Sequence, residues 1–151
     1  MLNSDYKDIL ESLLNAGADF ILVGAYALAT HGFPRATMDI VIWVNPSPEN
    51  AKRVYAALIK FGAPIDQISL EDLANEDTIF QIGAAPRRID ILTQITGVEF
   101  GDAWLKAVAV NIDGLTVKVL SAAHLIQNKT ATGRPKDLED AENLKKHLGK
   151  K

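Results

Sequence analysis

Two aspartates stand at or within apolar segments of this chain, where their residue type and position could support metal chemistry. Asp39 opens the segment Asp39–Val44, and Asp90 lies inside a second apolar segment, Arg88–Ile95. A buried carboxylate is costly unless it binds a cation or accepts hydrogen bonds. Carboxylate oxygens are ligands that Mg²⁺ prefers, usually together with the phosphates of a substrate. The pair therefore predicts magnesium-dependent chemistry on a nucleotide.

The strand expected at Asp39–Val44 decides which side chains can join this site. Side chains alternate along a strand, so Asp39 and Val41 share one face. A carboxylate at position 41 would let this strand clamp one or two Mg²⁺ ions for an in-line attack at phosphorus, but valine cannot coordinate a metal ion. Val41 leaves three alternatives: an inactive protein, a site completed by another carboxylate, or an engineered substitution.

A glycine turn precedes this strand and could receive phosphates. Phe20–Gly24 reads as a short apolar strand, and Tyr26–His31 reads as a compact helix. Because Gly24 has no side chain, a triphosphate could approach the backbone N–H groups at the start of that helix. The alternative is that Gly24 serves the turn alone.

The remaining pattern predicts how these elements are held. Asn3 or Ser4 caps a first helix that ends at Gly17, and Ser47 caps a helix that stops at Gly62. The further expected elements are a short helix at Leu70–Leu73, a hairpin of Thr78–Ile82 and Arg88–Ile95, a helix at Phe100–Ala107, a hairpin of Val108–Ile112 and Leu115–Leu120 around Asp113-Gly114, a helix from Ser121 to about Thr130, and a last helix at Asp137–Leu148. This order predicts an α+β fold, with a mixed sheet covered mainly on one side by helices.

Composition narrows the class of protein. With 151 residues, 48% apolar and 23% charged, the chain reads as a single domain over residues 1–151, with a helical C-terminal part at about 121–151. No apolar run is long enough for a membrane span, and no secretory signal is visible. The absence of cysteine fits the cytoplasm and excludes disulfides and thiolate metal sites. A net charge of −3 means that any nucleic-acid contact would need a local basic patch.

The segments GAYALATHGFPRATMDIVIWV and RRIDILTQITGV together resemble the nucleotidyltransferase superfamily that includes DNA polymerase beta. More narrowly, the chain resembles small bacterial and archaeal proteins related to abortive-infection toxin nucleotidyltransferases. These show a Gly-Gly or Gly-Ser turn, an Asp-x-Asp on the next strand and a third acid later. The resemblance implies a nucleotidyltransferase-type mixed sheet flanked by helices, and Mg²⁺ (or Mn²⁺) bound by Asp39 and Asp90. Asp90 is then the candidate general base.

The resemblance extends into the C-terminal part. The segment NKTATGRPKDLEDAENL matches the family pattern of Lys, Ala, Arg, a basic residue, Asp and a second Asp at Lys129, Ala131, Arg134, Lys136, Asp137 and Asp140. The implied nucleotide-binding residues are Gly24, Ala25, Arg35, Thr37, Lys129 and Arg134. Two positions depart from the family pattern: Val41 replaces the second acid of Asp-x-Asp, and Ala25 offers no hydroxyl to a phosphate.

Each of these residues also has a structural reading. Asp39 could pair with Arg35, and Asp90 could pair with Arg87 or Arg88. The alternatives for the others are a helix-terminal role for His31, a solvated basic loop for Lys129, Arg134 and Lys136, a helix N-cap for Asp137, and core positions for Trp43 and Trp104.

These observations lead to two expectations about function. The first is a metal-dependent enzyme that transfers a nucleoside monophosphate from an NTP to an RNA, protein or small-molecule acceptor, impaired by Val41. The second is a catalytically inactive module of the same fold that binds a nucleotide or a cognate partner protein, such as one half of a toxin–antitoxin pair. A structural domain without a nucleotide role is a third possibility.

Overall fold

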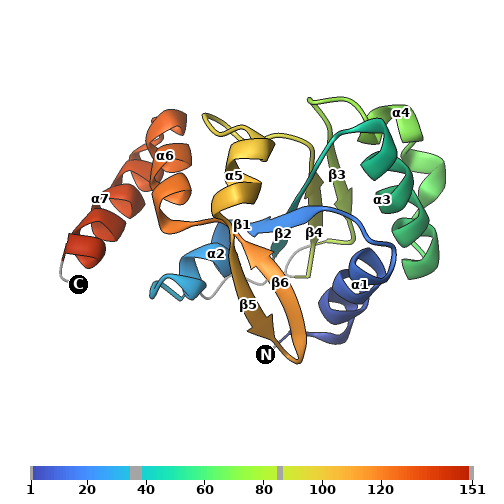
Figure 1. Ribbon diagram of the computed structural model, residues 1–151, viewed down its shortest axis with the longest axis horizontal. Coiled ribbons are helices and arrows are strands. Elements are labelled where there is room, and N and C mark those ends of the chain that lie inside the picture. Colours follow the sequence, from blue (N-terminus) through green and yellow to red (C-terminus); the bar gives the residue numbers. More distant parts are fainter. Residues whose placement is uncertain (1, 35–38, 85–86, 150–151) are drawn as a thin grey trace.

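A computed structural model describes residues 2–34, 39–84 and 87–149 and contains one mixed β-sheet flanked by helices (Figure 1). The helices are α1 (Ser4–Asn15), α2 (Gly24–Thr30), α3 (Pro48–Phe61), α4 (Leu70–Leu73), α5 (Phe100–Lys106), α6 (Ala122–Thr132) and α7 (Pro135–Gly149), with a 3-10 turn at Ile65–Gln67. The strands are β1 (Phe20–Val23), β2 (Ile40–Val44), β3 (Ile79–Ile82), β4 (Ile89–Leu92), β5 (Val108–Ile112) and β6 (Leu115–Val119). Among the described helices, none has the length and apolarity to cross a membrane. The predicted α+β class is confirmed.

Local sequence signals set most of the helix ends. The Asn3 side chain accepts a hydrogen bond from the Tyr6 amide at the start of α1, and Ser47 does the same for α3. Ser69 forms a reciprocal capping box at the start of α4. α3 ends where Gly62 adopts a left-handed conformation. Asn3, one of the two caps considered for the first helix, and the predicted signals at Ser47 and Gly62 are confirmed.

The sheet has the strand order β3-β4-β2-β1-β6-β5. β2 pairs with β4 in parallel, and β1 pairs with β6 in parallel, while the remaining neighbours are antiparallel. The two predicted hairpins, β3–β4 and β5–β6, are confirmed. Because β2 and β4 run in parallel side by side, residues near their amino ends come together at one edge of the sheet.

The strand register divides the side chains between two faces. Ile40, Ile42, Ile89 and Ile91 share one face and are buried. Trp43 lies on the opposite face and packs edge-to-face on Phe100 of α5, with 5.1 Å between the ring centroids.

In Figure 1, α1, α3 and α4 lie on one side of the sheet and α5, α6 and α7 towards the other. Helices therefore lie on both sides, which corrects the expectation of mainly one-sided cover.

The last helix begins earlier than its sequence pattern predicts. α6 ends at Thr132 and is capped by Gly133, which has φ +69°, and α7 begins with Pro135, so that only two residues separate the helices. Proline suits the first helical position because its fixed φ is helical and that position needs no N–H donor. Asp137 therefore lies inside the first turn of α7, and its predicted N-cap role is wrong.

Candidate functional site

The carboxylates of Asp39 and Asp90 converge on the guanidinium of Arg88. Nε of Arg88 lies 2.8 Å from Oδ1 of Asp90, and Nη2 lies 3.2 Å from Oδ2 of the same carboxylate. Nη2 also lies 3.2 Å from Oδ2 of Asp39. One nitrogen atom thus contacts both carboxylates, so their oxygens can reach a single cation between the amino ends of β2 and β4.

Backbone and side-chain contacts hold Arg88 at this place. Its carbonyl accepts a hydrogen bond of 3.1 Å from the amide of Ile40, the first residue of β2. The same carbonyl accepts a hydrogen bond of 3.2 Å from the hydroxyl of Tyr6, which is 1% exposed. Burial raises the pKa of the Tyr6 phenol, and the charges of Tyr26 and Asp39 raise it further. Tyr6 therefore remains a neutral donor and fixes the entry to β4.

The positive charge of Arg88 explains how the carboxylates of Asp39 and Asp90 can lie close together. Asp90 is buried, and its register partner on β2 is the apolar Val41. The hydrogen bonds to Asp90, followed by the negative charges of Asp90 and Asp39, raise the pKa of the Arg88 guanidinium above its ordinary value. The positive charge of Arg88 thus lies where two negative charges would otherwise repel each other.

Val41 fills space beside the glycine turn. Val41 lies opposite Val23 on β1 and opposite Asp90 on β4, so it shares their face of the sheet. A Cβ atom placed on Gly24 would come within 3.2 Å of Cγ2 of Val41. Gly24 has φ +67°, a conformation that residues with a side chain rarely adopt. The positive φ therefore favours glycine here, and an added side chain would also press against Val41.

The structure describes some of the residues predicted around the turn and leaves others outside the described ranges. Gly24 and Ala25 form the start of α2, and Val23 supplies no side-chain cap to its amides. Arg35 and Thr37 lie outside the described residues. Nε2 of His31 lies 2.8 Å from the carbonyl oxygen of Leu120, which supports the helix-terminal reading of this histidine.

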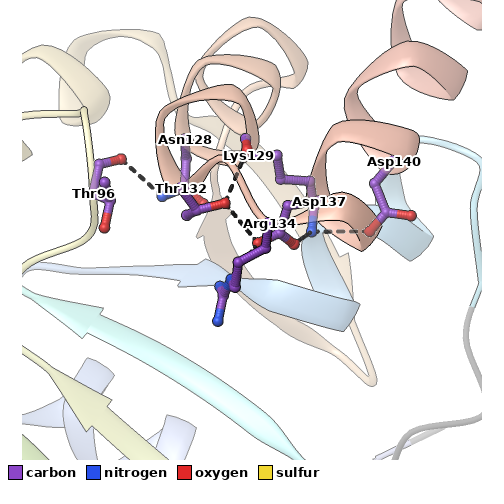
Figure 2. A network of polar contacts seen from close by, with 7 residues as sticks. All are labelled: Thr96, Asn128, Lys129, Thr132, Arg134, Asp137 and Asp140. Carbon is purple, nitrogen blue, oxygen red and sulfur yellow. Dashed lines mark hydrogen bonds and ion pairs between the residues drawn. The ribbon is translucent and has the colours of Figure 1, made fainter.

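The C-terminal basic residues form a separate network between α6 and α7 (Figure 2). Nζ of Lys129 lies 3.1 Å from Oδ1 of Asp137 and 3.1 Å from Oδ2 of Asp140. Arg134 donates to Oδ2 of Asp137 at 2.7 Å, and the hydroxyl of Thr132 donates to the same oxygen at 2.7 Å. The structure thus brings Lys129 and Arg134 together with Asp137, rather than leaving them as a solvated basic loop.

Hydrogen bonds dominate the ionisation of Asp137. Burial alone would raise the pKa of this carboxyl group. The hydrogen bonds from Thr132, Lys129 and Arg134, with the charge of Lys129, outweigh burial and hold the pKa below its ordinary value. Asp137 is therefore a charged acceptor that joins the end of α6 to the first turn of α7.

The role of Arg88 as a bridge between both acids was missed from the sequence. Arg88 was considered only as an alternative partner of Asp90. Arg88 and Asp90 are two residues apart, and strand alternation places such residues on one face. That spacing was the available signal, but the contact with Asp39 depends on the pairing of β2 with β4.

The donor set at the acidic pair suits a hard cation. Two carboxylates already share one positive group, and oxygen ligands are those that Mg²⁺ and Mn²⁺ prefer. Across the described residues, no group of three or more acidic or histidine side chains is arranged to hold a metal ion. A cavity of about 240 Å³ lies at the carboxyl ends of β2 and β4, and neither Asp39 nor Asp90 lines it.

Comparison with known proteins identifies the fold. No protein-family model and no curated protein matches the sequence. The crystal structure of a putative nucleotidyltransferase from Thermotoga maritima is similar over 100% of this chain and 97% of that chain, with a TM-score of 0.59 and 20% sequence identity. The chain therefore has a nucleotidyltransferase-like fold. The narrower resemblance to abortive-infection toxins stays a prediction.

Proposed function

We propose that this chain is a nucleotidyltransferase that moves a nucleoside monophosphate from an NTP to an RNA, protein or small-molecule acceptor, at a rate lowered by Val41. One observation carries the proposal: Asp39 and Asp90 approach the same guanidinium nitrogen, next to a strand whose Val41 packs on Gly24. The fold shared with the Thermotoga protein supports the proposal independently.

In this proposal the acidic pair would hold Mg²⁺ or Mn²⁺, which stabilises the charge that develops during phosphoryl transfer. Asp90 would accept the proton of the acceptor hydroxyl. The backbone N–H groups of Gly24 and Ala25 would bind phosphate oxygens. Arg134, whose side chain is 74% exposed, is better placed to meet a phosphate than Lys129, which is 11% exposed and contacts two carboxylates.

Arg88 has to leave the acidic pair before a cation can lie there. Its side chain is 33% exposed, so it can turn towards solvent without disturbing the core. Binding of the nucleotide and its cation therefore competes with an internal ion pair. This competition, together with the missing third carboxylate, would lower the rate of nucleotide transfer.

The direct test is incubation of the purified chain with each labelled NTP, Mg²⁺ or Mn²⁺, and cellular RNA or protein. We expect slow incorporation of label that requires the divalent cation and disappears in both Asp39→Asn and Asp90→Asn. Absence of labelled product under every condition would reject enzymatic activity. Label that survives both substitutions would place the reaction elsewhere.

Val41→Asp tests whether the missing carboxylate limits this site. The new side chain would lie opposite Asp90 and share a face with Asp39, so we expect tighter Mn²⁺ binding and faster transfer. Val41→Asn is the matched control, because it has the same shape and polarity without the charge. Mn²⁺ affinity is measured by calorimetry or electron paramagnetic resonance. Equal affinities in the two variants would show that the cation binds somewhere else.

A second candidate function is a catalytically inactive module that binds a nucleotide or a partner protein, as in a toxin–antitoxin pair. Val41 favours it, because an apolar side chain that cannot coordinate a metal ion faces Asp90 where the family pattern has a second carboxylate. Calorimetry with NTP separates the two functions. Nucleotide binding without turnover supports the inactive module, whereas metal-dependent turnover rejects it.

A further inference from the structure

The β5 edge of the sheet is open. In the part of the chain that the structure describes, β5 pairs with β6 alone. Val108, Ala109 and Asn111 are exposed, and Val108 retains 40% of its surface. Leu105, just before the strand, is 80% exposed. Figure 1 shows the β5–β6 hairpin projecting from the body of the sheet. An open strand edge with apolar side chains can pair with another strand.

The usual features that prevent such pairing are missing from β5. Its sequence, VAVNI, contains no charged residue and no proline. The opposite edge strand, β3, is also uncharged but is shorter, with 4 residues against 5. Asp77 lies before β3 and Gly83 lies after it. The two ends of β3 therefore do not carry charges of opposite sign, which could attract each other between two antiparallel copies of the strand.

The hairpin geometry shows which backbone groups of β5 point outward. Asp113 and Gly114 both have positive φ, at 51° and 86°, as in a two-residue hairpin turn. Ile112 and Leu115 flank the turn and form the first hydrogen-bonded pair of the ladder. Hydrogen-bonded pairs alternate along antiparallel strands, so the N–H and C=O groups of Ala109 and Asn111 face the open edge.

These outward groups are complementary to themselves under a two-fold rotation. With the axis at Val110, Ala109 lies opposite the partner's Asn111, and each such pair exchanges two backbone hydrogen bonds. Val108 then lies opposite the partner's Ile112 on one face of the joined sheet. This register pairs every outward N–H and C=O group of the strand.

The charges at the ends of β5 fit the same register. Lys106 and Asp113 are both exposed, and they flank the strand at opposite ends. In this register Ala107 lies opposite the partner's Asp113, so the neighbouring Lys106 and the partner's Asp113 lie at the same end of the interface, and the symmetry repeats this arrangement at the other end. Asp113 accepts a hydrogen bond from the amide of Leu2 through Oδ2, which leaves Oδ1 for the lysine.

We propose that β5 pairs with β5 of a second copy of this chain, which extends the sheet through an antiparallel two-fold interface. A second copy is the occupant favoured by the observations, because backbone groups, apolar side chains and charges are all self-complementary about one axis. The interface is small, so association is weak and reversible. It involves no residue of the acidic site, and it holds whether or not the chain is an enzyme.

Sedimentation velocity tests this interface at concentrations from about 10 μM to about 1 mM, the range in which small transient interfaces associate. We expect the wild-type chain to shift from the mass of a monomer, 16.4 kDa, towards twice that mass. Ala109→Pro removes an outward N–H without touching the β5–β6 ladder, so it should abolish the shift. Ala109→Ser retains the N–H and should dimerise as the wild type does.

A charge variant keeps the test decisive if the proline variant fails to fold. Lys106→Glu places a second negative charge at the end of the interface that carries the partner's Asp113 and should weaken dimerisation at least tenfold, whereas Lys106→Arg should not. Circular dichroism verifies that each variant is folded. A wild-type chain that stays monomeric at about 1 mM overturns the interface. So does a dimer that persists unchanged in Lys106→Glu, because its contacts must then lie elsewhere.

Discussion

At the scale of single residues, Arg88 and Val41 decide the state of the acidic site. Arg88 supplies a positive charge within 3.2 Å of both Asp39 and Asp90. Val41 occupies the face on which a further carboxylate would stand, and it packs against Gly24. The site therefore carries its own counter-charge, and an apolar side chain lies beside the glycine turn.

The first prediction concerns Arg88. In Arg88→Gln the carboxylates lose their shared cation, so we expect a lower melting temperature in EDTA than for the wild type. Added Mg²⁺ or Mn²⁺ should recover much of that loss, because the ion would then bind between the same oxygens. Mn²⁺ affinity should rise several-fold.

Arg87→Gln is the control for this prediction, since Arg87 is an exposed neighbour of the same charge. Thermal unfolding with and without the divalent cation measures both variants. If Mn²⁺ affinity is the same in Arg88→Gln and in the wild type, Arg88 does not compete for the site.

The second prediction concerns Gly24. Gly24→Ala adds a side chain at φ +67° and places it 3.2 Å from Val41, so we expect a loss of about 1–3 kcal/mol in unfolding free energy. Gly62→Ala is the control, because Gly62 has φ +91° but nothing within 4 Å of the added atom. Urea denaturation should show the larger loss for Gly24→Ala. Equal losses would mean that Val41 imposes no constraint.

At the scale of elements, the α6–α7 connection depends on a carboxylate network. Only Gly133 and Arg134 separate the two helices, and Asp137 accepts from Lys129, Thr132 and Arg134 across this turn. Lys129 and Asp140 are both largely buried, so their ion pair is protected from solvent. The C-terminal motif thus has a structural role in addition to any role in binding.

The third prediction concerns Asp137. Asp137→Asn should lower the unfolding free energy by about 1–3 kcal/mol at neutral pH, because charge-assisted hydrogen bonds are lost and Lys129 loses one partner. The folded-state pKa of Asp137 lies below its unfolded value, so its contribution is complete above the unfolded pKa and decreases as pH falls through the folded pKa. The difference between wild type and variant should therefore shrink in acid.

Glu139→Gln provides the control for Asp137, since Glu139 is an exposed carboxylate on the same helix. We expect it to change stability little at any pH. Urea denaturation at a series of pH values gives both comparisons. A difference between wild type and Asp137→Asn that stays constant in acid would contradict the lowered pKa.

At the scale of the whole molecule, one sheet connects the acidic site with the open β5 edge. β1 lies at its centre between β2 and β6, and its four residues are all buried. Loss of packing at β1 should therefore affect both halves of the sheet together. The single-domain organisation predicted from chain length depends on this cooperativity.

The fourth prediction tests that cooperativity. Leu22 is 0% exposed, so Leu22→Ala should cost about 2–5 kcal/mol through lost burial and a cavity. Ile79→Ala is the control, because Ile79 on the edge strand β3 is 68% exposed and should cost far less. Tryptophan fluorescence and far-UV circular dichroism should give coincident unfolding curves for each variant. Separate transitions would divide the chain into more than one folding unit.

The sequence by itself determined the local structure and the candidate acids. Caps such as Ser47 and Ser69, the Asp113-Gly114 turn and the left-handed Gly62 act within a few residues, so their effects can be inferred from neighbouring positions. The apolar segments around Asp39 and Asp90 likewise predicted strands that would carry carboxylates.

Only the tertiary structure decided which residues surround those two carboxylates. The contact of Asp39 with Arg88 requires β2 and β4 to pair in parallel, and the contact of Val41 with Gly24 requires β1 and β2 to pair in register. Strand order also left β5 at an edge. Pairing and order depend on contacts between residues far apart in the chain, and local sequence patterns do not specify them.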